Sequence, residues 1–113
     1  GKIAIVETDL EFNIWSPLAM IRIKETYVSK YFYYRFQTQT LQKRIKRFIN
    51  SSSQGNIGMG DIGKLIFEFP KSKEEQQKIA TYLSSIDTKI EAVNNQITQT
   101  QTFKKGLLQQ MFV

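Results

Sequence analysis

The sequence contains neither cysteine nor histidine. Without cysteine the chain has no disulfide, and no thiolate to bind a metal or act as a nucleophile. Without histidine, Ser-His-Asp chemistry and ordinary zinc sites are excluded as well. These absences argue against a self-contained enzyme, and we expect no catalytic residue, no metal site and no cofactor.

Long hydrophobic runs are also missing. No stretch approaches the roughly 18 apolar residues of a membrane span, and the start shows no signal-peptide pattern. We therefore expect a cytoplasmic protein with no membrane partner. The 113 residues suit one domain or one domain with an appendage, and a hydrophobic content of 41% is enough to form a core. Because the chain begins with Gly1 and not with methionine, we expect an excised or processed fragment.

Positive charge is concentrated in one part of the chain. The net charge is +6, and residues 30–64 account for all of it, because this window holds only one acid, Asp61. Such a focused basic patch favours a polyanionic partner, most often nucleic acid. The alternative is a basic helix face that is merely solvated. The bases of the window are Lys30, Arg35, Lys43, Arg44, Lys46, Arg47 and Lys64.

Three segments have the composition of β-strands. Residues 2–7 and 18–24 are rich in β-branched and apolar side chains and are separated by a predicted turn. Residues 64–69 alternate in polarity and end at Pro70, which closes a strand.

Helical periodicity begins near Tyr27. Val28, Phe32 and Phe36 are spaced by four, as one apolar helix face requires. A second helix is predicted over residues 39–49, with an apolar side and a basic side. Its apolar side carries Leu41, Ile45, Phe48 and Ile49, and its basic side carries Lys43, Arg44, Lys46 and Arg47.

After Pro70 the sequence predicts one long helix. Ser72 and Glu75 have the spacing of a capping box at its start. Apolar residues then recur with spacings of 4-3-4-3-4, which is a heptad seam suited to a partner helix. A long helix that folds back on its own domain is the alternative. The seam consists of Ile79, Leu83, Ile86, Ile90, Val93 and Ile97.

These elements predict an α+β fold with two parts. Residues 1–70 form a small mixed α/β module, and residues 71–113 form a long coiled-coil helix at the C-terminal end. The glycines between the basic helix and the third strand do not form a phosphate-binding loop, because the Gly-Lys-Ser/Thr ending is missing.

The basic helix and the polar loop after it predict a nucleic-acid surface. Lysine and arginine neutralise phosphates, and we assign this role to Lys43, Arg44, Lys46 and Arg47. Serine, glutamine and asparagine offer donors and acceptors to base edges, and we assign base-proximal contacts to Ser52, Ser53, Gln54 and Asn56. A flexible connector is the alternative for this loop. The aromatic run at residues 31–36 suits core packing better than base stacking, because Phe32 and Phe36 point inward.

Several features recur at fixed spacing from residue 51 onward. They are Pro70 at the end of a predicted strand, the Glu75-Gln76 pair, Lys78-Ile79, Leu83, Ile86-Asp87, Ile90 and the terminal "KKGLLQQMF". In these features the chain resembles the specificity subunits of type I restriction–modification systems. The resemblance covers the end of a target recognition domain and the conserved spacer helix after it.

This resemblance implies a non-catalytic subunit that recognises double-stranded DNA. Each target recognition domain of such a subunit recognises half of a bipartite site, and the conserved helices set the spacing between the halves. The helices also dock methyltransferase subunits, which hold S-adenosylmethionine and methylate adenine. A motor and nuclease subunit joins the same complex, so it is an indirect partner.

The length of the chain leaves room for part of one recognition domain and one conserved helix. Because the seam then lacks its partner helix, we expect an antiparallel homodimer through the C-terminal helix. Two other functions stay open at this point. One is a structural coiled-coil oligomerisation module, and the other is the target domain of a fused adenine DNA methyltransferase.

Overall fold

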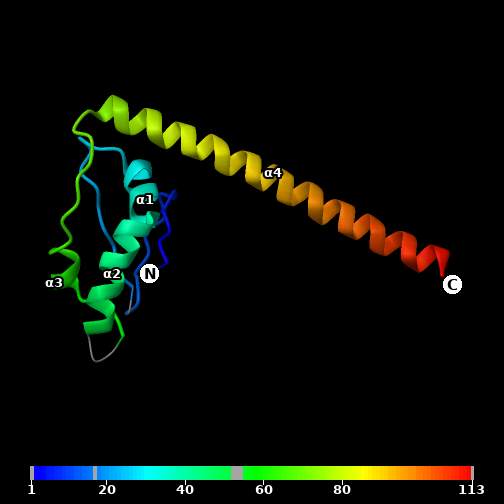
Figure 1. Cartoon of the computed structure of the whole chain (residues 1–113), viewed down its shortest axis with the longest axis horizontal. Helices are drawn as coiled ribbons and strands as arrows, with labels where there is room; N and C mark the ends of the chain where they lie inside the picture. Colours follow the sequence, from blue (N-terminus) through cyan, green and yellow to red (C-terminus); the bar gives the residue numbers. More distant parts are fainter. Residues whose placement is uncertain (1, 17, 52–54, 113) are drawn as a thin grey trace. The chain divides into compact units, whose positions relative to one another are not determined.

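The computed structural model describes residues 2–16, 18–51 and 55–112. This part of the chain contains four helices (Figure 1). The chain divides into two compact units, Gly1–Ala80 and Thr81–Val113. The helices are α1 (Ser29–Gln37), α2 (Gln39–Ser51), α3 (Met59–Ile62) and α4 (Lys73–Met111).

The predicted α+β fold class is wrong, because no described residue belongs to a β-strand. Residues 2–7, 18–24 and 64–69 lack regular secondary structure, although some of their apolar side chains pack on the core. These are Ile3, Ile23, Leu65, Phe67 and Phe69. A strand also requires a neighbouring backbone to complete its hydrogen bonds. Two carbonyl groups of residues 64–69 instead accept hydrogen bonds from the side chains of Arg35 and Arg44.

The first predicted helix is confirmed as α1. The side chains of Tyr31, Phe32 and Phe36 are buried, and they form one face of the helix as the spacing of four requires. Phe32 is 6% exposed. Its ring makes edge contacts with four others, at centroid distances of 5.1–6.2 Å. These rings belong to Tyr27, Tyr31, Phe67 and Phe69.

The second predicted helix is confirmed as α2, which extends two residues beyond the predicted end. Leu41 is fully buried and Ile45 is buried beside it, so the predicted apolar side faces the core. Thr38 separates α1 from α2. Its backbone carbonyl accepts a hydrogen bond from the backbone amide of Gln42 at 2.9 Å. Its side-chain hydroxyl donates one to the Arg35 carbonyl at 2.8 Å. These bonds end one helix and begin the next.

A short helix, α3, lies in the glycine-rich stretch after α2, where we predicted a loop and no helix. Its single turn is closed by backbone hydrogen bonds from residues 61 and 62 to the Gly58 carbonyl, at 3.0 and 3.1 Å. Just before it, Gly55 has a φ of +67°, a conformation that glycine adopts without strain. The composition of the sequence does not indicate a helix this short, because a single turn involves only a few residues.

Helix α4 begins with a serine cap. The Ser72 hydroxyl accepts a hydrogen bond from the Glu75 backbone amide at 3.3 Å, which is one of the two hydrogen bonds of the predicted capping box. The same hydroxyl donates to the Glu74 carboxylate at 2.7 Å. The pKa of Glu74 is lowered mainly by this hydrogen bond. A backbone hydrogen bond to the same carboxylate lowers it further. Both glutamates also lie at the positive end of the helix dipole.

The first two turns of α4 belong to the compact unit Gly1–Ala80. Ala80 is fully buried in the core, and Ile79 packs against it. Gln76 is also fully buried, and its side-chain amide is satisfied at both ends. Its oxygen accepts from the Val28 amide at 3.0 Å, and its nitrogen donates to the Pro70 carbonyl at 2.6 Å. The helix start is therefore fixed to α1 and to the preceding segment.

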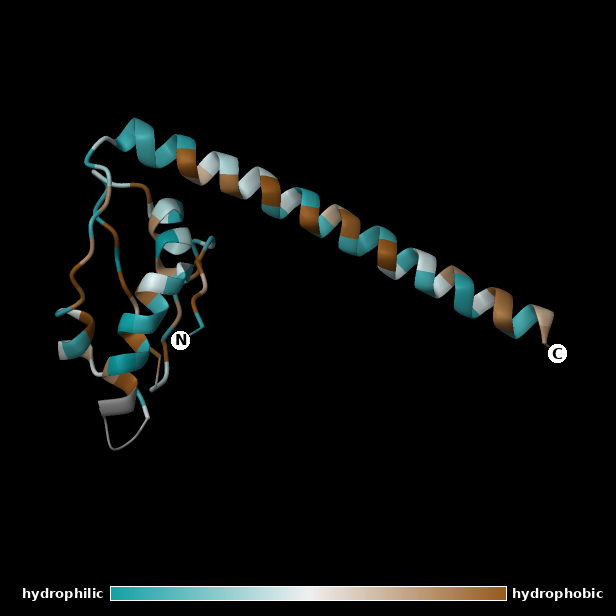
Figure 2. Cartoon of the chain, in the orientation of Figure 1, coloured by the Kyte–Doolittle hydropathy of each residue, from teal (hydrophilic) through white to brown (hydrophobic). Residues whose placement is uncertain are grey.

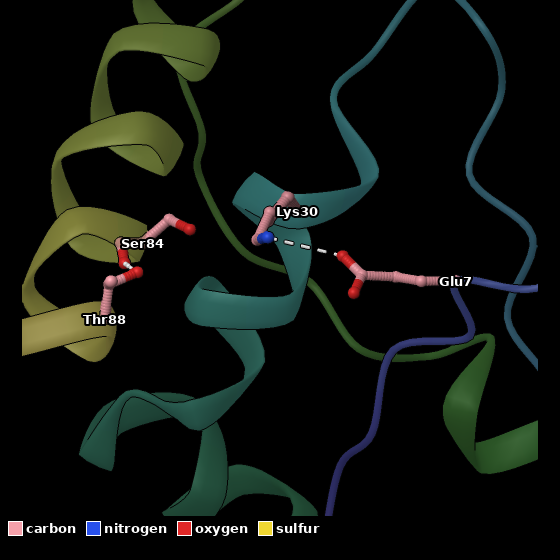
Figure 3. A network of polar contacts seen from close by, with 4 residues as sticks. All are labelled: Glu7, Lys30, Ser84 and Thr88. Atoms are coloured by element: carbon pink, nitrogen blue, oxygen red, sulfur yellow. Dashed lines mark hydrogen bonds and ion pairs between the residues drawn. The ribbon is translucent and has the colours of Figure 1, made fainter. Parts of the chain in front are cut away.

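The second unit consists of the remainder of α4. Figure 2 shows hydrophobic residues recurring along the helix among hydrophilic ones. Threonine hydroxyls donate to the carbonyl four residues earlier, as Thr88 does to Ser84 at 3.1 Å (Figure 3). The same bond forms at Thr98, Thr100 and Thr102. Such bonds satisfy hydroxyl groups inside the helix itself.

Candidate nucleic-acid interface

Helix α2 presents an exposed basic face. Its sequence contains no acidic residue, and the side chains of its four bases are all exposed. With about 100° between successive residues, Lys43, Lys46 and Arg47 lie opposite the buried Leu41 and Ile45. The predicted amphipathic character of this helix is therefore confirmed, and it follows from apolar residues that hold one side against the core.

Two bases of the predicted patch form ion pairs within the protein. Lys30 pairs with Glu7 at 3.3 Å (Figure 3), and Lys64 pairs with Asp61 at 2.9 Å. Each pair neutralises one positive charge locally, so these lysines contribute less to attracting an anion.

Two arginines are hydrogen-bonded to backbone carbonyls. The guanidinium of Arg35 donates twice to the Glu68 carbonyl, at 3.3 Å each, and lies 5.9 Å from the ring centre of Phe67. Arg44 donates to the Ile66 carbonyl. Both side chains thus hold residues 66–68 against the helices. The sequence did not indicate these roles, since the partners lie more than 20 residues away.

The remaining bases of the window have no partner in the described part of the chain. They lie within five residues on the exposed face of α2, and no acid flanks them on that helix. Within the basic window, these are the bases whose side chains bond to no described residue, so their charge is available to a ligand. The three residues are Lys43, Lys46 and Arg47.

The polar loop after α2 is described only in part. Ser52, Ser53 and Gln54 lie outside the described residues, so their predicted base contacts stay predictions. Asn56 is exposed and follows Gly55 directly. The assignment of Asn56 to base contacts likewise remains a prediction.

The heptad seam divides between the two units. Ile79 packs against the core of the first unit and Leu83 is half-buried. Leu83 and the other four seam residues lie in the second unit, and those four are 36–53% exposed. Apolar side chains that recur at this spacing suit a partner helix. These four are Ile86, Ile90, Val93 and Ile97.

Comparison with known proteins identifies the family. The model of the type I restriction modification DNA specificity domain matches residues 14–101. The chain belongs to this family, and the suspected resemblance is confirmed.

Two curated relatives come from Methanocaldococcus jannaschii. The type I restriction enzyme MjaIX specificity subunit is 33% identical over 96% of this chain and 24% of its own length. The putative type I restriction enzyme MjaX specificity subunit is 30% identical over 99% of this chain and 27% of its own length. The chain thus spans about a quarter of each relative. No solved structure matches.

Two further properties concern the described residues alone. None of their helices has both the length and the hydropathy needed to cross a membrane. They also contain no group of three or more acidic, histidine or cysteine side chains placed to hold a metal ion.

Proposed function

We propose that this chain recognises double-stranded DNA as part of a type I specificity subunit, with α2 as a contacting element. The observation that carries the proposal is a group of three basic side chains that bond to none of the described residues and lie on an acid-free helix face. Lys43, Lys46 and Arg47 contact phosphates, and Arg44 contributes from the edge of the same face. The loop between α2 and α3 contacts the edges of the DNA bases in this proposal, through Ser52, Ser53, Gln54 and Asn56.

The long helix α4 supplies the scaffold in this proposal. Its heptad seam packs against another helix, and the assembled helices dock methyltransferase subunits that methylate adenine. A motor and nuclease subunit joins through that complex. The chain itself binds and positions DNA and has no catalytic role. Family membership and the exposed seam support this part of the proposal.

Replacing Lys43, Lys46 and Arg47 together by alanine in the intact subunit is expected to weaken DNA binding about 10- to 100-fold. Three lost phosphate contacts also lower the slope of log affinity against log salt by about 3. Fluorescence anisotropy at several salt concentrations measures both quantities.

The matched control replaces three exposed polar residues of the second unit, Gln99, Gln101 and Gln109, by alanine. This control leaves the affinity and the salt slope unchanged. If the charge variant also binds DNA with unchanged affinity and slope, α2 is a solvated face and the chain is a structural oligomerisation module.

Self-association through the seam is a second expected result. At micromolar concentration the chain should sediment at twice its mass of 13.2 kDa. Ile90→Asp places a charge in the seam and should give a monomer, since a buried unpaired charge is costly. Thr88→Asp, on the side away from the seam, should remain dimeric. Analytical ultracentrifugation that finds a wild-type monomer would reject the homodimer.

A further inference from the structure

The polar side chains of α2 fall into two groups. Gln42 and Arg44 are bound to the protein itself. The side-chain amide of Gln42 donates a hydrogen bond to the Phe36 carbonyl at 2.8 Å. The Arg44 guanidinium donates one to the Ile66 carbonyl. The second group is exposed and makes no side-chain hydrogen bond or ion pair with any described residue. It consists of Gln39, Thr40, Lys43, Lys46 and Arg47.

Within the second group, three residues form a row. Gln39, Lys43 and Arg47 are spaced by four, so they follow one another along the same side of the helix. This side lies opposite Leu41 and Ile45, which are buried. The row is about 12 Å long at 1.5 Å per residue. Along a DNA groove that length corresponds to between three and four base pairs, at about 3.4 Å each.

The uncharged member of the row is informative. Electrostatic attraction to phosphates accounts for exposed lysine and arginine, but it does not account for glutamine. A glutamine amide carries a donor and an acceptor side by side, and it can bond to N6 and N7 of adenine in the major groove. Gln39 is the first residue of α2, and recognition helices contact base edges with their N-terminal residues.

We propose that α2 lies in the major groove and that Gln39 recognises an adenine there. Lys43 and Arg47 continue the row along the groove, where each can bond to a guanine edge as well as to a phosphate. Lys46, at the side of the row, contacts the phosphate backbone only. This inference rests on the proposed function, because it names the bases and the groove for a helix already proposed to contact DNA.

The test uses the complete specificity subunit assembled with its methyltransferase subunits, in cells without other adenine methylation. Sequencing that detects N6-methyladenine gives the methylated motif for each variant. In Gln39→Ala, one adenine–thymine position of the motif should become degenerate, with discrimination there reduced about tenfold or more. The other positions of the motif should be unchanged.

A control variant and a second variant of Gln39 complete the test. Gln37→Ala removes an exposed glutamine whose side chain, among the described residues, bonds only to the Tyr33 carbonyl of its own helix. It should keep the wild-type motif. Gln39→Glu leaves only acceptors at the proposed contact, so it should shift the preference at the same position from adenine toward cytosine. An unchanged motif in both Gln39 variants would overturn the inference.

The outcomes separate this inference from the proposed function. If Lys43, Lys46 and Arg47 are needed for binding while both Gln39 variants keep the motif, α2 contacts only the backbone, and the inference alone fails. If the charge variant binds DNA normally, the proposed function fails. Circular dichroism of each variant confirms that the helices are retained.

Discussion

Replacing Phe32 by alanine is expected to lower the free energy of unfolding of the first unit by about 3–5 kcal/mol, the range for a large aromatic removed from a core. The ring contacts four other aromatic rings, from α1, from the segment before it and from residues 64–69. Its loss therefore leaves a cavity where three segments meet. Urea denaturation followed by circular dichroism measures the change.

The control for this variant is Phe12→Ala, since Phe12 is 49% exposed. Its effect should be within about 0.5 kcal/mol, as for most surface substitutions. A similar loss of stability in the two variants would contradict the position of Phe32 at the centre of the core.

Replacing Gln76 by alanine is expected to destabilise the same unit by about 2–5 kcal/mol. The Val28 amide and the Pro70 carbonyl lose their partner, and a buried polar group left unpaired costs about 1–3 kcal/mol. Hydrogen exchange should also accelerate at the start of α1, because Val28 is its N-cap residue.

Gln99→Ala, at an exposed position of the same helix, is the matched control and should change stability by less than about 0.5 kcal/mol. A loss below about 1 kcal/mol for Gln76→Ala would show that water replaces the buried amide.

Helices α1, α2 and α4 could be predicted from the sequence because their periodicity is local, whereas the single turn of α3 was missed. The spacing of Phe32 and Phe36 determines which face of α1 is apolar, and the seam of α4 is a repeat within one segment. The predicted strands failed because pairing depends on a second segment. Residues 64–69 are apolar enough for a strand, but two of their carbonyls accept hydrogen bonds from the side chains of Arg35 and Arg44. Composition cannot show which group reaches a carbonyl.

The candidate site was predictable to a similar degree. The charge excess identified α2 from the sequence, because it depends only on residue types. Which bases remain available depends on the fold, since Arg44 is hydrogen-bonded to a residue 22 positions later. The buried role of Gln76 had no local signal either. A glutamine near a helix start is ordinarily exposed, and only the packing of α4 on the core buries this one.

The burial of Gln76 and Ala80 determines where recognition modules can be exchanged between related subunits. A chimera joined directly after Pro70 would separate residues 1–70 from the first two turns of α4, which complete the core of the first unit. Such a hybrid would take Gln76 and Ala80 from another protein and would depend on a chance match at both positions. A crossover after Ala80 instead transfers the first unit with its own core, so hybrid subunits joined there should fold. If α2 contacts DNA as proposed, they should also carry the donor's DNA preference.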